Sequence, residues 1–377
     1  MKIFSLPPIP LALLFTTLKV LAQKNNGEEC SCFRTDSASS GYFTYHRFHD
    51  FRTVAAAAQT VPDLIANESD TSNALATSDF FTGQAWNNDW STQSWNNSDT
   101  MVESGSSVLM INSPNNVYIE TSTDNDASYD TYLTLRTARL PNFQSVAEFD
   151  SNEKNFKYLS ARFLARVVGS DGACAGMFTY LDSNPIQEAD IEILTSGPRN
   201  VVQYTNQPSL NKAGDADPRA TSNASTADRT MDWSVWNTYR MDWMPKQTSW
   251  YVNGESVASI SYQVPKSPSG LILNMWSDGG EWTGNMSLYD EAFLQVQWIE
   301  LVYNTSGDYA GSKRELENRK SKGCKVVCGV DEGVNITGTP AVLINNTNAG
   351  TMGWKEGTGS MGWVPVVVVG LAVFGWL

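Results

Sequence analysis

Three carboxylates on alternate residues are the part of this sequence best suited to chemistry. They are Glu188, Asp190 and Glu192, and they lie in a run from Ile186 to Leu194 that is otherwise mostly apolar. Side chains alternate between the two faces of a strand, so a strand here would place all three acids on one face. Like charges that are buried together drive their pKa values apart. The pattern therefore predicts paired carboxyl groups in different protonation states, as cleavage of a glycosidic bond requires.

The spacing of the outer two acids also favours one stereochemical course. The Cα atoms of Glu188 and Glu192 would lie roughly 13 Å apart on an extended strand. Two long glutamate side chains that lean inward on a concave face would bring the carboxyl groups to about 5–5.5 Å, the separation found in retaining glycosidases. We therefore expect retention of the anomeric configuration.

The elements that must position these acids are predicted to be strands. Short β-like runs separated by turn residues extend from Cys30 to about Tyr303, and long amphipathic helical periodicity is nearly absent. Asn253-Gly254 between two such runs is a strong two-residue hairpin signal. Many short strands at regular spacing predict an all-β sandwich or barrel.

Motifs on both sides of the acids give them a family context. The order is a Gly-rich aromatic strand, the three acids, a strand with Gln and an aromatic residue, a hairpin, an Asn-x-Trp-Ser-x-Gly-Gly-x-Trp segment and a closing strand. The segments concerned are Gly172–Tyr180, Val202–Tyr204, Asn237–Trp243 with Trp250–Gly254, Asn274–Trp282 and Val296–Leu301. In this order the chain resembles glycoside hydrolase family 16 over about residues 41–305, and specifically its fungal type with a glycosylphosphatidylinositol (GPI) anchor.

The resemblance implies a concanavalin-like β-jelly-roll sandwich of two curved antiparallel sheets, with a cleft on the concave face. It also implies that Glu188 is the nucleophile, that Glu192 is the general acid/base, and that Asp190 modulates both. The expected substrate is cell-wall β-glucan, cut or transferred through a glycosyl-enzyme intermediate. The motif has no extra residue between Asp190 and Glu192, as in lichenases and in fungal wall transglycosylases.

Residues outside the acid triplet are candidates for binding sugar. Flat aromatic and amide side chains after the triplet provide four expected substrate contacts, although core packing uses the same residue types. These four are Gln203, Tyr204, Trp276 and Trp282. An earlier cluster of tryptophans is assigned to packing instead; it comprises Trp86, Trp90 and Trp95.

Two other functions compete with the enzymatic one. A lectin-like jelly roll would hold glucan without cutting it, but it would have no use for three clustered acids. A structural wall mannoprotein would need no cleft and ranks last.

The composition limits the classes of partner and ligand that the protein is expected to bind. The formal net charge of −14 argues against nucleic acid, which is recognised through basic patches. The two histidines, His46 and His49, lie together near the N-terminus and make a His-rich metal site implausible. We expect a monomer without a cofactor. A structural calcium would be compatible with a glucanase-like jelly roll, but no ligand spacing indicates one.

Both ends of the chain carry apolar segments that indicate secretion and anchoring. Residues 1–22 are typical of a signal peptide, and residues 349–377 of a GPI-attachment signal with Asn348 as the attachment residue. Between them we predict a catalytic domain over residues 30–328 and a flexible stalk over residues 329–348. The protein would lie at the cell surface or in the wall, attached to the membrane through its lipid anchor alone.

Seven Asn-x-Ser/Thr sequons agree with a secreted, glycosylated protein. They are at Asn67, Asn96, Asn223, Asn285, Asn304, Asn335 and Asn345.

Five cysteines in a secreted chain predict disulfides. Cys30 and Cys32 lie near the mature N-terminus, whereas Cys324 and Cys328 follow the last core strand. We expect the first pair to bridge to the second and to clamp the chain ends together, with the individual partners open. Cys174 lies among small residues and is predicted to be a buried free thiol.

Overall fold

The computed structural model describes residues 29–36, 42–55, 61–125, 128–307 and 324–346. The predicted signal peptide, the predicted GPI-attachment signal and Asn348 lie outside these residues. No helix within them combines the length and apolarity needed to cross a bilayer.

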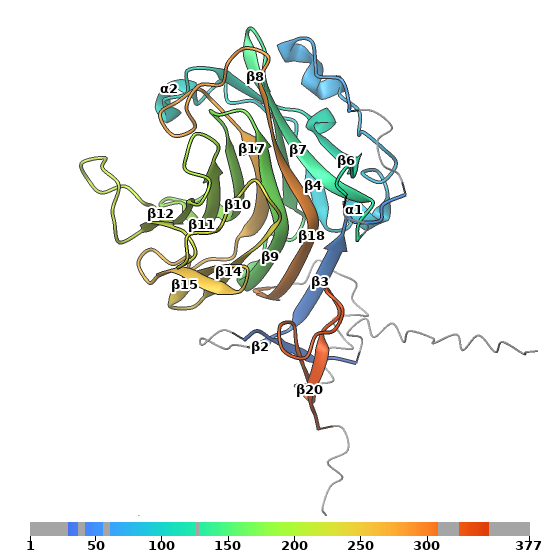
Figure 1. The fold of residues 1–377 in the computed structure, drawn as a ribbon. Coiled ribbons are helices and arrows are strands. Elements are labelled where there is room, and N and C mark those ends of the chain that lie inside the picture. Colours follow the sequence, from blue (N-terminus) through green and yellow to red (C-terminus); the bar gives the residue numbers. More distant parts are fainter. Residues whose placement is uncertain (1–28, 37–41, 56–60, 126–127, 308–323, 347–377) are drawn as a thin grey trace, which may run out of the picture.

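The main body is a curved, nearly closed β-sheet, as expected for a jelly roll (Figure 1). One layer carries the strands that line the concave face: β13 (Thr221–Ala224), β12 (Val202–Gln207), β11 (Gln187–Leu194), β10 (Cys174–Leu181), β17 (Gly270–Trp276), β8 (Phe143–Ser151) and β4 (Trp90–Thr92). The other layer comprises β6 (Val117–Thr121), β7 (Thr131–Arg139), β18 (Glu291–Thr305), β3 (Tyr45–Asp50), β9 (Phe156–Gly169), β14 (Asn237–Met244), β15 (Gln247–Val252) and β16 (Glu255–Ile260).

The two layers are continuous along one edge. Strand β8 pairs with β17 on one side and with β7 on the other, and β5 (Leu109–Asn112) joins it in parallel. The remaining pairs of the large sheet are antiparallel, and short helical segments occur only in its connections. These segments are η1 (Glu68–Asn73), α1 (Gln84–Asn87), α2 (Met101–Ser104) and η2 (Pro114–Asn116).

The core lies between the layers and is built by alternation along the strands. Ile191 of β11 is fully buried, as is Met241 of β14 in the facing layer. The ring of Tyr204 from β12 lies 5.6 Å from that of Trp250 from β15. The predicted hairpin at Asn253-Gly254 joins β15 to β16, and both turn residues have positive φ, 51° and 83°, as a type I′ turn requires.

A small second sheet joins the two ends of the described chain. Its strand order is β2 (Tyr42–Phe43), β1 (Cys32–Arg34), β19 (Val326–Gly329) and β20 (Ala341–Asn345), and it lies below the large sheet in Figure 1. Disulfides link Cys30 to Cys328 and Cys32 to Cys324. The predicted bridging of the two cysteine pairs is therefore confirmed, and Cys174 is a buried free thiol as expected.

The sequence predicts a flexible stalk from residue 329 onward. For residues 329–346, which the structure describes, this prediction is wrong. Strand β20 pairs with β19 in an antiparallel register that includes Val326 and Asn345. The turn between them also carries Asp331, which accepts two hydrogen bonds from Arg162 of β9, at 3.0 and 2.9 Å. The Gly/Thr/Asn-rich composition suggested an unpacked chain, but the strand partner and the ion pair hold this segment against the main body.

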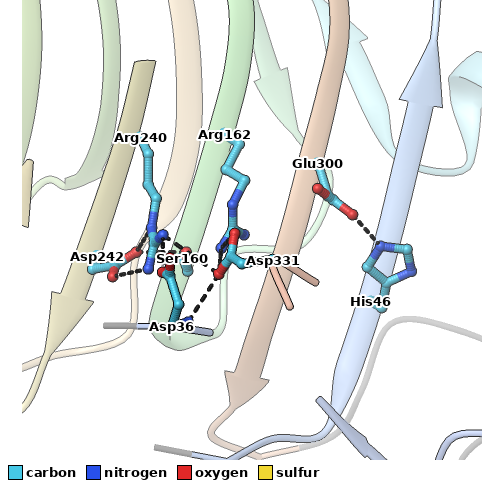
Figure 2. A network of polar contacts seen from close by, with 8 residues as sticks. All are labelled: Asp36, His46, Ser160, Arg162, Arg240, Asp242, Glu300 and Asp331. Carbon is cyan, nitrogen blue, oxygen red and sulfur yellow. Dashed lines mark hydrogen bonds and ion pairs between the residues drawn. The ribbon is translucent and has the colours of Figure 1, made fainter. Parts of the chain in front are cut away.

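An arginine–aspartate network fixes this attachment on the outer face of the large sheet (Figure 2). Arg240 of β14 donates to Asp242 at 2.8 and 2.7 Å and to Asp36 of the N-terminal segment at 2.6 Å. Ser160 of β9 also donates to Asp242, at 2.5 Å. Their strand neighbours, such as Met241, point into the core, so the network occupies the opposite face.

Candidate active site

Strand β11 presents the three predicted acids on the concave face. Ala189 and Ile191, which alternate with them, are fully buried in the core between the layers. Glu188, Asp190 and Glu192 therefore share the opposite face, as the alternation predicted. Asp190 is 1% exposed, whereas the two glutamates are half-buried and reach the cleft.

The strand register builds a row of polar side chains beside the acids. Glu192 lies opposite Gln203 of β12 and Gly176 of β10, and Gly176 lies opposite Asn274 of β17. Asn274 in turn lies opposite Glu148 of β8. A Cβ atom at Gly176 would approach Asn274 Oδ1 to 2.5 Å, so the close packing of this row depends on a glycine there.

Two donors hold one oxygen of Glu192. Trp282 donates from Nε1 to Glu192 Oε1 at 3.2 Å, and the Cys174 thiol donates to the same atom at 3.5 Å. Both interactions favour the ionised carboxylate. Both donors act on Oε1, so Oε2 is the oxygen of Glu192 that neither of them contacts.

The electrostatics of the triplet favour protonated carboxyl groups. Burial, then the charge of Glu192, raise the pKa of Glu188 to about 7, while its interaction with Asp190 opposes the rise. Burial followed by the charges of Glu188 and Glu192 raises the pKa of Asp190 well above its ordinary range. Burial also raises the pKa of Glu192, against the two donors on Oε1. No cation contributes to any of these shifts, so the three groups cannot all ionise near neutral pH.

The contact between Glu188 and Asp190 is close but imperfect. Neither carboxyl oxygen of Asp190 forms a hydrogen bond of regular geometry, yet the two groups interact strongly enough to move both pKa values in opposite directions. The interaction raises the pKa of Asp190 and lowers that of Glu188 relative to burial alone. Such an arrangement keeps Glu188 more ionised than burial alone would allow.

The cleft over the acids consists of two adjoining cavities of about 530 and 460 Å³. Trp95, Met110 and Trp276 line both, so the cavities form one continuous groove. Glu192 lines the larger cavity, toward β12 and β13, and Glu188 lines the other, toward β17 and β8. Among the described residues, no group of three or more His, Cys, Asp or Glu side chains is arranged to hold a metal ion.

Comparison with known proteins agrees with this geometry. Residues 87–299, more than half of the 377-residue chain, match the model of glycosyl hydrolases family 16. The chain belongs to this family.

Individual relatives in family 16 are distant. The β-glucanase of Bacillus subtilis (strain 168) is 27% identical over 135 residues, which cover 34% of this chain and 51% of that protein. Congo red hypersensitive protein 1 of Saccharomyces cerevisiae is 27% identical over 188 residues, covering 44% and 36%. The chain thus spans about half the length, or less, of these curated relatives. A solved lichenase from a mouse hindgut metagenome superposes with a TM-score of 0.46 and 18% identity, over 69% of this chain and 99% of that one.

Of the four predicted substrate contacts, two line the cleft, one lies next to Glu192 on the same face of the sheet, and one lies in the core. Trp276 and Trp282 line the groove, and Gln203 lies beside Glu192 on the same face. Tyr204 is 1% exposed and packs in the core against Trp250, so its assignment to substrate is wrong. Neighbouring residues on a strand face opposite ways, and the register places Gln203 on the side of the acids.

The groove also contains residues that the sequence alone did not predict there. The sequence predicts packing for Trp95, as for Trp86 and Trp90, but Trp95 is 41% exposed and lines both cavities. Its Nε1 donates to Glu148 at 2.8 Å. Burial raises the pKa of Glu148 to about 7. A signal for Glu148 existed, since Glu148 and Asp150 alternate with buried Ala147 and Phe149, but only the register with Asn274 connects β8 to the triplet.

Proposed function

We propose that this chain is a retaining glycoside hydrolase that acts on cell-wall β-glucan through a glycosyl-enzyme intermediate. The observation that carries the proposal is the presence of Glu188 and Glu192 on one strand face, with a buried acid between them, at the floor of a groove. The β-glucanase names of the bacterial relatives support β-glucan as the substrate class. The tryptophans that line the groove, Trp95, Trp276 and Trp282, offer the flat apolar surfaces on which sugar rings stack.

The first half of the reaction forms the intermediate. The ionised Glu188 attacks the anomeric carbon and forms an ester bond to it, while the glycosidic bond to the leaving sugar breaks. Protonated Glu192 gives its proton to the departing oxygen, so the leaving sugar departs as a neutral alcohol. The proton held on Asp190 stabilises the negative charge on Glu188 before the attack.

In the second half, Glu192 is ionised and acts as a base. It removes a proton from an incoming hydroxyl group, whose oxygen attacks the anomeric carbon and displaces Glu188. Two inversions at one carbon give net retention. Water as the nucleophile gives hydrolysis, whereas a sugar hydroxyl gives transfer to a second glycan.

We infer that the protein works at the cell surface. The apolar segments at both ends favour secretion and a GPI anchor, and the similarity to a yeast protein hints at a fungal type. An enzyme held next to wall glucan has abundant sugar acceptors, which favours transfer. Release of the protein from cells by a phosphatidylinositol-specific phospholipase tests the anchor, and retention after treatment would contradict it.

The central experiment compares wild type and Glu188→Gln on β-1,3/1,4-glucan and on wall chitin–glucan. NMR of the first-formed product should show retention for wild type, and inversion would overturn the assignment of the nucleophile. A labelled oligosaccharide acceptor separates hydrolysis from transfer. Equal, negligible turnover by both proteins, with retained glucan binding, would favour the lectin-like alternative. Glu103→Gln, an exposed acid of α2, is the matched control and should behave as wild type.

A further inference from the structure

The two ends of the groove are chemically different, and this difference gives the groove a direction. Glu188 lines the cavity toward β17 and β8, and Glu192 lines the cavity toward β12 and β13. Under the proposed function, the nucleophile faces the sugar that becomes attached, and the acid/base faces the leaving or incoming sugar. The end at β12 and β13 is therefore the acceptor end.

A glycosylation sequon lies at this acceptor end. Asn223 of β13 is opposite Gln203 of β12, and Gln203 is opposite Glu192. Residues that are directly paired across a sheet share a face, so Asn223 projects on the side of the acids. Two strand spacings correspond to roughly 10 Å across the sheet. Thr221, two residues earlier on the same face of β13, lines the larger cavity.

Asn223 also has room for a modification. Its side chain is exposed, and Asn223-Ala224-Ser225 is a complete sequon. Strand β13 is the last strand of the large sheet at this edge, and within the described residues no further strand pairs with its outer side. An attached glycan would therefore stand in solvent beside the groove opening.

Two other sequons are less suited to this position. Asn96 lies between groove-lining Trp95 and Asn97, but its Oδ1 accepts a hydrogen bond from the Ser98 amide at 3.1 Å. Asn335 is exposed in the connection between β19 and β20 of the small sheet and provides a comparison site. The small sheet lies below the large sheet that carries β11 (Figure 1).

We propose that Asn223 carries an N-linked glycan that forms the outer wall of the acceptor end and limits the length of glucan that can enter there. A short acceptor fills the cavity beside Glu192 without reaching the edge of the sheet. A long chain that continues past β13 must pass the glycan, which is itself a bulky hydrated oligosaccharide. This inference rests on the proposed function for the direction of the groove.

The test uses the full chain secreted from a eukaryotic host. Glycopeptide mass spectrometry should find Asn223 occupied, and an unoccupied Asn223 would overturn the proposal. Transfer and hydrolysis are then measured with a labelled trisaccharide acceptor and with long glucan, for wild type, Asn223→Gln and Asn335→Gln. We expect Asn223→Gln to raise the long-to-short rate ratio about threefold or more, and Asn335→Gln to leave it unchanged. An unchanged ratio in Asn223→Gln would also overturn the proposal.

A binding version of the experiment separates this proposal from the proposed function. Dissociation constants for the same short and long glucans are measured with Glu188→Gln and with Glu188→Gln/Asn223→Gln. Loss of the Asn223 sequon should tighten binding of the long ligand alone. Absence of turnover in wild type would then count against the catalytic assignment, while the binding ratio would still decide the role of Asn223. Thermal unfolding of each variant checks that the fold is retained.

Discussion

Two carboxylate clusters on opposite faces of the same domain differ in whether arginine side chains accompany them. On the outer face, Asp36, Asp242 and Asp331 share Arg162 and Arg240. On the concave face, the acid triplet of β11 has no cation among the causes of its pKa shifts. Asp190 and Asp242 are each 1% exposed, so at equal depth the difference between the two clusters lies in their neighbours.

The pKa shifts of these carboxyl groups reflect the balance between burial and these neighbours. Burial alone would raise the pKa of Asp36, but the hydrogen bond and charge of Arg240 outweigh it and lower the pKa. Asp331 is deeper, and burial raises its pKa although Arg162 and Arg240 oppose the rise. In the triplet nothing cationic opposes burial, and the pKa of Glu188 reaches about 7. Paired charges hold a structure together, whereas unpaired acids keep protons that a reaction can use.

The largest expected effect is the loss of catalysis in Glu188→Gln. Without the nucleophile, kcat on β-glucan should fall by about 10³-fold or more, because the amide cannot form the ester intermediate. Initial rates and far-ultraviolet circular dichroism measure activity and fold separately. A variant that retains more than a tenth of wild-type activity would remove Glu188 from the mechanism.

Removal of an arginine from the arginine–aspartate network on the outer face should lower the stability of the protein and leave catalysis intact. Arg240→Met leaves the carboxylate of Asp242, which is 1% exposed, without its arginine partner. The substitution should lower the free energy of unfolding by about 3–5 kcal/mol. Urea unfolding at pH 7 measures this, and kcat per folded molecule should not change. Arg199→Met is the matched control, because Arg199 forms an exposed 4.0 Å pair with Asp232 and should contribute less than about 1 kcal/mol. Equal losses in both variants would contradict the distinction.

The triplet should make the protein less stable as pH rises. The folded protein keeps a proton on Glu188 up to about pH 7, whereas an unfolded chain releases it near 4.5. Stability therefore falls between these pH values, and Glu188→Gln should stabilise the protein at pH 8 by about 1–3 kcal/mol and have little effect at pH 4. Chemical denaturation at both pH values tests this. Destabilisation at pH 8 would show that the carboxylate is better solvated than its burial implies.

The smallest predicted effect concerns the thiol on Glu192. Cys174→Ala removes one of two donors to Oε1, so the pKa of Glu192 should rise further. The alkaline limb of the pH profile of kcat/KM should then move to higher pH by a few tenths of a pH unit, roughly the effect of one weak donor. Cys174→Ser, with a stronger donor, should move the limb the other way. Movement in the same direction for both would assign Cys174 to packing alone.

Local alternation explains how much the sequence predicted. It placed the acids of β11 on one face because Ala189 and Ile191 between them are apolar, and it placed the Asn253-Gly254 turn because few residue pairs adopt two positive φ values. The set of bridging cysteines followed from their positions at the two ends of the core. Each of these conclusions depends on residues within a few positions of one another or on simple counting.

The structure decided what depends on contacts between distant segments. The register of β12 against β11 selects Gln203 over Tyr204, and the pairing with β19 orders β20. The disulfide partners are decided only where the two ends of the described chain meet. Strand β8 brings Glu148 into the groove from about forty residues upstream of the triplet. The degree of burial that sets the carboxyl pKa values also arises only when the layers close. Sequence fixes which face a side chain occupies on its own strand, but the strand's neighbours and the loss of water determine what that side chain can do.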